Sequence, residues 1–166
     1  MEMMCDMKTR DRFLSTLFAL SLAVAPALGQ QISVQTEKGK ETVLTRADIE
    51  TLPRIKVAVT APVSATFEGV LLKDALARGG VGFGETMRGE GMASCLLVEA
   101  TDGYRVVIAL PEIDPAFTDK QFVLAFSKDG KALDSKEGPY RIVIPEEKRM
   151  ARWVRQVTTL KIVAVQ

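Results

Sequence analysis

Alternation of apolar and polar residues along the chain predicts a series of short strands. The pattern alternates over 32–36 and again over 41–44, with Glu37-Lys38-Gly39-Lys40 between them, which predicts a hairpin. Asp102-Gly103 is typical of a two-residue turn and joins two of the later strands. Those later strands are predicted over 55–60, 94–101, 104–110, 122–127, 140–144 and 157–165.

Helical patterns are few and short. Thr45-Arg46-Ala47-Asp48 has the residue types of a capping box and predicts a helix that runs to about Leu52. A second helix is predicted over 71–78 because its leucines and alanines share one face, and Gly79-Gly80 ends it. Because short helices are interspersed among the strands, the predicted fold class is α+β with a mainly antiparallel or mixed sheet.

Three stretches carry no strand or long-helix pattern. Residues 61–66 are predicted to form a loop, and Phe67-Glu68-Gly69-Val70 is predicted to lead from it into the second helix. Residues 81–93 are rich in glycine and charge, so they are predicted to be a mobile loop. The glycines at 79–84 do not fit G-x-G-x-x-G and follow a helical pattern, so no phosphate-binding loop is predicted there.

The N-terminal residues have the pattern of an export signal. Lys8, Arg10 and Arg12 precede an apolar run over 13–28, and Ala27-Leu28-Gly29 places small residues before a cleavage site. A transmembrane anchor is the alternative, but a spanning helix needs about 20 apolar residues, and this run is shorter. We therefore expect a signal peptide over 1–29, one globular domain over 30–166, a periplasmic or secreted location and no membrane contact after cleavage.

Charge gives no reason to expect a polyanionic partner. The chain has 22 basic and 21 acidic residues, and the predicted signal peptide removes as many of one as of the other, so the net charge stays at +1. The basic segment 148–155 contains the only tryptophan and could bind nucleic acid by charge and stacking. The adjacent Glu146-Glu147 and the predicted export argue against it, so a small anionic ligand or a partner protein is expected instead.

Two missing residue types restrict the chemistry. The chain contains no histidine and no asparagine, which excludes Ser-His-Asp and Cys-His catalysis and histidine zinc sites, and no metal site is predicted. Cys5 leaves with the predicted signal peptide, so Cys95 remains without an internal disulfide partner. Cys95 is either a buried inert thiol on a strand or a redox or metal-ligating thiol. Carboxylates such as Asp114 and Asp119 are predicted to be solvated loop residues.

Five segments resemble a known family. In order and spacing over about 45–165, the chain resembles the sulfite oxidase-type oxidoreductase molybdopterin-binding domain. The segments are Phe67–Leu76, Asp102-Gly103-Tyr104, Leu124–Leu133, Gly138–Pro145 and Ala151–Val154. The resemblance implies a sulfite oxidase-like fold with a mixed sheet and short interspersed helices. It also implies molybdopterin, whose molybdenum takes a cysteine thiolate, and redox chemistry on small oxoanions or sulfoxide-type substrates.

The same resemblance suggests residue roles. Arg141 falls on the family arginine that contacts the pterin phosphate, and Arg152 falls where the family usually has a lysine near that phosphate. Tyr104 falls near a tyrosine that faces substrate, and it is otherwise a strand residue beside a turn. Arg141 is otherwise predicted to form a structural salt bridge with a nearby glutamate, namely Glu137, Glu146 or Glu147.

The chain departs from the family at the metal ligand. The family cysteine lies in the loop before the Phe67 segment, but residues 60–66 contain no cysteine, and Cys95 comes about thirty residues later. Family enzymes leave the cytoplasm folded, with cofactor, through a twin-arginine signal, whereas Asp11 separates Arg10 from Arg12 here. These departures predict that no cofactor is bound.

Three functions remain open on the sequence. The first is a non-catalytic binding or sensing module with an anion-accepting pocket at Arg141 and Arg152. The second is a molybdopterin-dependent oxidoreductase with an unusual ligand set, for which Cys95 and Tyr104 are the candidate catalytic residues. The third is an exported scaffold without a small ligand.

Overall fold

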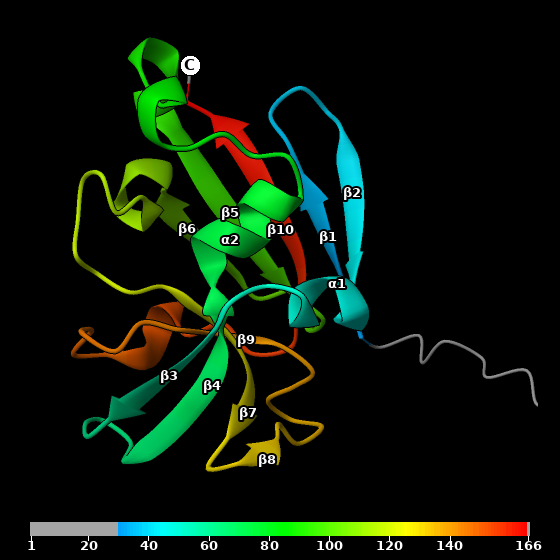
Figure 1. Cartoon of the computed structure of the whole chain (residues 1–166), viewed down its shortest axis with the longest axis vertical. Coiled ribbons are helices and arrows are strands. Elements are labelled where there is room, and N and C mark those ends of the chain that lie inside the picture. The colour runs from blue at the N-terminus through cyan, green and yellow to red at the C-terminus, as the bar shows by residue number, and fades with distance from the viewer. Residues whose placement is uncertain (1–29, 166) are drawn as a thin grey trace, which may run out of the picture.

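The structure is a computed structural model that describes residues 30–165, without the side chains of Thr86 and Glu90. The predicted signal peptide over 1–29 lies outside the described residues. Two β-sheets follow one another along the long axis of the molecule (Figure 1). In the orientation of Figure 1 we call them the upper and the lower sheet.

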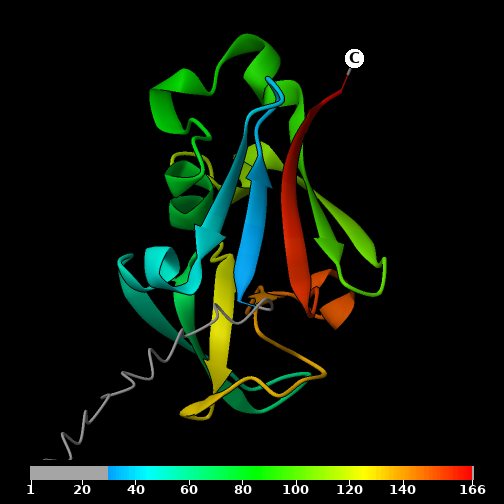
Figure 2. The same cartoon turned by 90° about the vertical axis from the view of Figure 1, so that its right-hand side faces the viewer.

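The upper sheet is mixed. Its strand order is β2 (Glu41–Thr45), β1 (Gln31–Gln35), β10 (Val157–Ala164), β5 (Ser94–Ala100) and β6 (Arg105–Ala109). β1 and β10 pair in parallel and the other neighbours pair antiparallel, and Figure 2 shows β1 between β2 and β10. The two predicted hairpins of this sheet are therefore confirmed.

The lower sheet is antiparallel. Its strands are β3 (Arg54–Val59), β4 (Ala65–Leu71), β7 (Val123–Lys128) and β8 (Lys131–Ala132), with β9 (Arg141–Val143) also paired to β7. The helices are short: α1 (Arg46–Glu50), α2 (Leu72–Arg78) and the 3-10 turns η1 (Gly84–Thr86), η2 (Gly89–Ala93), η3 (Leu110–Ile113) and η4 (Met150–Arg152). The predicted α+β class is confirmed. None of the helices within residues 30–165 has the length and apolar character needed to cross a bilayer.

α1 begins as predicted. The Thr45 hydroxyl accepts a hydrogen bond from the Asp48 backbone N–H at 3.2 Å, and the Thr45 backbone N–H donates to the Asp48 carboxylate at 3.0 Å. This reciprocal pair is a capping box, which satisfies backbone donors at a helix start. The helix ends at Glu50, two residues before the predicted Leu52.

β4 was missed by the sequence pattern. Residues 65–71 form a seven-residue strand between β3 and β7, not a loop and a helix approach. The strand was not predicted because it contains Glu68 and Gly69, and a charged residue and a glycine are both unusual inside a strand. The glycine is needed there: a Cβ on Gly69 would lie 2.2 Å from the Leu124 carbonyl oxygen of β7.

A buried carboxylate, Asp114, forms a hydrogen bond with the segment that follows α2. Asp114, predicted to be solvated, is in fact buried, and its carboxylate accepts hydrogen bonds from the backbone N–H groups of Gly84 at 2.5 Å and Ala116 at 3.0 Å. Burial alone would raise the pKa of Asp114, but these backbone hydrogen bonds outweigh it and the pKa lies below its usual value. Asp114 thus ties residues 81–93 to the segment after η3; their mobility stays a prediction.

One hydrophobic core runs through both sheets. The segment before β10 joins them, because the Ile142 N–H donates to the Val154 carbonyl at 2.8 Å and the Val157 N–H donates to the Tyr140 carbonyl at 3.0 Å. β9 therefore pairs with β7 on one side and with residues 154–157 on the other. This junction positions the side chains of the candidate site.

Candidate functional site

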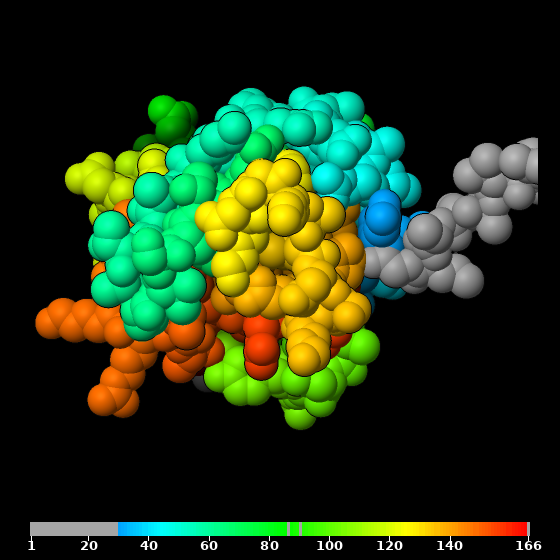
Figure 3. Space-filling view, turned by 90° about the horizontal axis from the view of Figure 1, so that it is seen from below, coloured from blue at the N-terminus to red at the C-terminus, as the bar shows by residue number. Residues whose placement is uncertain are grey.

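A hollow of about 310 Å³ opens at the junction between the lower sheet and the segment around η4. Seen from below, the segment that follows β9 (orange) lies beside the β3–β4 hairpin (teal) (Figure 3). We call this site the basic hollow. It is lined by Val63, Phe67, Lys128, Glu137, Arg141, Met150, Trp153 and Arg155.

Arg141 is a buried charge on the wall of the basic hollow. Only 4% of the residue is exposed, because it lies on the short buried strand β9. Its Nη1 contacts a Glu137 carboxylate oxygen at 2.8 Å, which is the structural salt bridge that the sequence left open. Its Nε has no hydrogen-bond partner among the described residues. A buried guanidinium N–H without a partner is rare and is satisfied by water or a bound group.

Two aromatic rings pack around the Arg141 guanidinium. Its central carbon lies 5.1 Å from the centre of the Phe67 ring and 5.7 Å from the Trp153 ring. The two rings meet edge to face, with centres 5.9 Å apart. Trp153 is buried, and its indole N–H donates to the Ile144 carbonyl at 3.1 Å. Cation–π contacts and this packing fix the direction of the guanidinium.

Positive charge exceeds negative charge in the lining. Lys128, Arg141 and Arg155 supply three cations against the single carboxylate of Glu137. Glu137 lies 3.7 Å from the Lys128 ammonium, so it partly neutralises both of its neighbours. Burial lowers the pKa of Arg141, Glu137 opposes that shift, and the positive charge of Arg155 lowers the pKa further. The net charge of the lining favours an anion.

Arg152 lies outside the basic hollow. Its Nε contacts a Glu147 carboxylate oxygen at 2.6 Å, and its Nη1 lies 3.4 Å from Glu112 of η3. Burial alone would lower the pKa of Arg152, but the two carboxylates raise it above its usual value. Arg152 thus joins the loop after β9 to η3, and Arg155 is the arginine that lines the hollow together with Arg141. A cofactor contact by Arg152 stays a prediction.

Tyr104 is close to the other side of η4. Its hydroxyl donates to the Ala151 carbonyl at 2.8 Å, and its ring is half exposed. It lines a shallow depression of about 230 Å³ that shares Met150, Trp153 and Arg155 with the basic hollow. The η4 segment therefore separates Tyr104 from Arg141.

Cys95 lies in the upper sheet, whereas the β3–β4 turn belongs to the lower sheet. On β5, Ser94, Leu96 and Val98 are buried, whereas Cys95 and its alternate neighbours are half-buried on the opposite face. Its strand partners are Ala109 and Val163, near the upper end of the sheet. No group of three or more acidic, cysteine or histidine side chains in residues 30–165 is arranged to hold a metal ion.

Residues 41–165 match the family of oxidoreductase molybdopterin-binding domains. The chain belongs to this family. The resemblance seen in the sequence is thereby confirmed, and the chain is a domain of the molybdopterin-binding oxidoreductase type. Among curated protein sequences, none matches this chain significantly.

A solved structure supports the sulfite oxidase-like fold. The sulfane dehydrogenase SoxCD from Paracoccus pantotrophus superposes with a TM-score of 0.61 at 20% sequence identity. The match covers 81% of this chain and 38% of that one, so this domain spans less than half of that protein's length. At this identity the likeness concerns the fold.

The family cofactor fits the described residues only in part. The loop between β3 and β4 places Val63 at the basic hollow and offers no thiol, while Cys95 lies on another sheet. Within the described residues, the chain therefore has no thiol in the loop where the sequence resemblance places the family's molybdenum ligand. The phosphate end of the pterin does fit the charge of the basic hollow, because Arg141 and Arg155 face it.

Several residues of this site were not predicted from the sequence. Lys128 is the last residue of β7, and Arg155 follows the tight turn after η4, so neither had a distinctive motif. Phe67 was part of a family segment but was not given a role. The excess of basic residues in 148–155 was the one available indication of Arg155.

Proposed function

We propose that this domain is a non-catalytic member of its family that binds a small anionic ligand in the basic hollow. The observation that carries the proposal is the buried Arg141, whose Nε has no partner among the described residues and which lines a hollow with two further cations. Guanidinium groups bind phosphate and carboxylate oxygens through paired N–H donors. A bound anion would supply the partner that the Arg141 Nε lacks.

The same proposal holds that no molybdenum chemistry takes place. A thiolate ligand must be deprotonated and correctly placed, and the β3–β4 turn has hydroxyl and apolar side chains in its place. We further propose that the domain acts in the periplasm or outside the cell after removal of residues 1–29. That part rests on the basic, apolar and small-residue pattern of the N-terminus.

Anion binding is tested by titration with inorganic phosphate. Trp153 is the only tryptophan of the chain and lies in the wall of the basic hollow, so its fluorescence reports on binding there. Arg141→Ala should weaken phosphate binding by about 1.5–3 kcal/mol, the range for hydrogen bonds to charged groups. Arg155→Gln should weaken it by about 1 kcal/mol because this side chain is exposed.

The matched control is Arg105→Gln, which removes an exposed arginine of β6 that does not line the hollow. Its phosphate affinity should equal that of the unaltered protein. Because Arg141→Ala removes a buried side chain, the folding of this variant is checked by thermal unfolding. If Arg141→Ala does not fold, the comparison of Arg155→Gln with the control decides the test. Equal phosphate affinity in Arg155→Gln and Arg105→Gln would count against the site.

The absence of molybdenum chemistry is tested by elemental and pterin analysis of protein isolated from its own host. We expect molybdenum far below one atom per chain, because the described residues offer no thiolate at the β3–β4 turn. Cys95→Ser is analysed in parallel. Near-stoichiometric molybdenum that disappears in this variant would contradict the proposal and make Cys95 the ligand of a molybdopterin-dependent oxidoreductase.

A further inference from the structure

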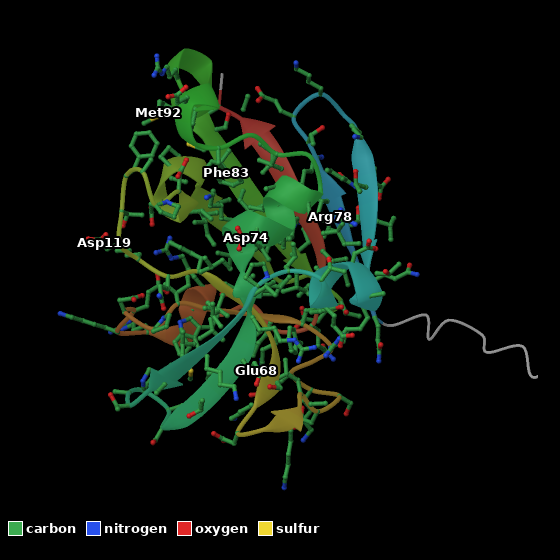
Figure 4. The ribbon with its side chains drawn as sticks, in the orientation of Figure 1. Glu68, Asp74, Arg78, Phe83, Met92 and Asp119 are labelled. Carbon is green, nitrogen blue, oxygen red and sulfur yellow. The ribbon has the colours of Figure 1, made fainter. Side chains whose placement is uncertain are left out.

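A second hollow lies near the upper end of the molecule and shares no lining residue with the basic hollow. Its volume is about 430 Å³, and it lies between the β1–β2 turn and the segment that links α2 to β5. Phe83 and Met92, labelled in Figure 4, mark that segment. We call this second hollow the upper hollow. The residues that matter for its chemistry are Lys38, Lys40, Met87, Ser94, Leu110 and Ile162.

The floor of the upper hollow is apolar. Met87, Leu110 and Ile162 line it, and each of them is buried against the core. Small-molecule sites in proteins have this character: mostly apolar walls, a volume of several hundred Å³ and a few polar groups that fix orientation. The floor therefore suits an alkyl chain or a ring.

One polar group lies among these apolar side chains. Ser94, the first residue of β5, is only 3% exposed, and its hydroxyl has no hydrogen-bond partner among the described residues. A buried hydroxyl without a partner is destabilising, and most buried polar atoms have one. Ser94 is one of the lining residues of the upper hollow, so a ligand oxygen that reached its hydroxyl would supply the missing hydrogen-bond partner.

The rim of the upper hollow is basic. Lys38 and Lys40 of the β1–β2 turn are exposed and form no ion pair within residues 30–165, and Glu37 is the rim carboxylate beside them. The Lys40 ammonium lies over the turn that ends α2, 3.9 Å from where a Cβ on Gly80 would be. Among the described side chains of the lining, two cations against one carboxylate favour an anionic group at the mouth.

We propose that the upper hollow binds an amphipathic carboxylate with an oxygen at each end. The carboxylate lies at the rim beside Lys38 and Lys40, the apolar body lies on the floor, and the inner hydroxyl or carbonyl oxygen accepts a hydrogen bond from Ser94. This site is independent of the basic hollow, so neither proposal rests on the other.

Three probes of one length separate the parts of the site. They are 8-hydroxyoctanoate, octanoate, which lacks the inner oxygen, and octane-1,8-diol, which lacks the carboxylate. Binding is measured by calorimetry and by amide chemical shifts of the purified protein. We expect 8-hydroxyoctanoate to bind about fivefold more tightly than either partial probe, since a net hydrogen bond or weak ion pair contributes about that factor. The largest shifts should fall in residues 36–40 and 80–94.

Variants assign each contact. Ser94→Ala should bind 8-hydroxyoctanoate only as tightly as octanoate, without a loss of thermal stability, because its hydroxyl has no partner to lose. The double variant Lys38→Gln, Lys40→Gln should reduce 8-hydroxyoctanoate to the affinity of the diol and leave diol binding unchanged. Ser127→Ala and the double variant Lys131→Gln, Lys136→Gln, in the lower half of the fold, are the matched controls.

Three results would overturn the proposal. One is the absence of shifts in 36–40 and 80–94 at millimolar 8-hydroxyoctanoate. Another is full affinity in Ser94→Ala. The third is binding that Arg155→Gln weakens and the upper-hollow variants do not, since that would place the probe in the basic hollow.

Discussion

Gly69→Ala is expected to lower the free energy of unfolding by about 3 kcal/mol or more, although it adds a single methyl group. Gly69 lies where β4 pairs with β7, next to an irregularity of register. A Cβ there would lie 2.2 Å from the Leu124 carbonyl oxygen and 2.7 Å from the Ala125 Cα. Both are backbone atoms of a buried strand, so neither can move aside without disturbing the sheet. Chemical denaturation of the variant measures the effect.

Gly39→Ala is the matched control for this prediction. Gly39 lies in the β1–β2 turn with a φ of +76°, and a Cβ there meets nothing within 4 Å. Its replacement introduces only the left-handed strain of a non-glycine residue, about 1 kcal/mol. If the two variants lose equal stability, then the contact between β4 and β7 is not what requires glycine at position 69.

The elements predicted correctly from the sequence are those whose pattern is local. Thr45 and Asp48 form their capping box within one turn of chain, and Asp102-Gly103 closes a hairpin between adjacent strands. β4 was not predicted because the requirement for glycine at position 69 comes from Leu124, which lies far along the chain. The burial of Asp114 was not predicted for the same reason, since that burial and the hydrogen bond from the Gly84 N–H arise only from tertiary packing.

In the candidate site, too, local features were predicted from the sequence and long-range contacts were not. The family resemblance pointed to Arg141, and the salt bridge predicted as its alternative role is formed with Glu137. The sequence did not indicate that Lys128 and Arg155 converge on it, because they come from separate elements brought together by β7 and the segment before β10. Cys95 illustrates the limit most clearly, since strand alternation alone did not settle which face of β5 was buried.

Glu137→Gln is expected to lower the free energy of unfolding by about 3 kcal/mol in buffer without phosphate or sulfate. The substitution leaves Arg141 buried and without a countercharge, with Lys128 and Arg155 lining the same hollow. The double variant Glu137→Gln, Arg141→Met should recover much of the loss, because it removes the uncompensated charge. Glu112→Gln is the control: its partner Arg152 is more exposed and keeps Glu147, so a loss below about 1 kcal/mol is expected.

Phosphate should then stabilise Glu137→Gln more than the unaltered protein. Without Glu137 the lining of the basic hollow carries three cations and no carboxylate, so the guanidinium of Arg141 is free to bind the anion. A ligand that binds only the folded state adds about 2.7 kcal/mol at a hundredfold excess over its Kd. Thermal unfolding at increasing phosphate, with ionic strength held constant by chloride, measures this gain. Equal phosphate responses in Glu137→Gln and Glu112→Gln would show that the basic hollow is not where the anion binds.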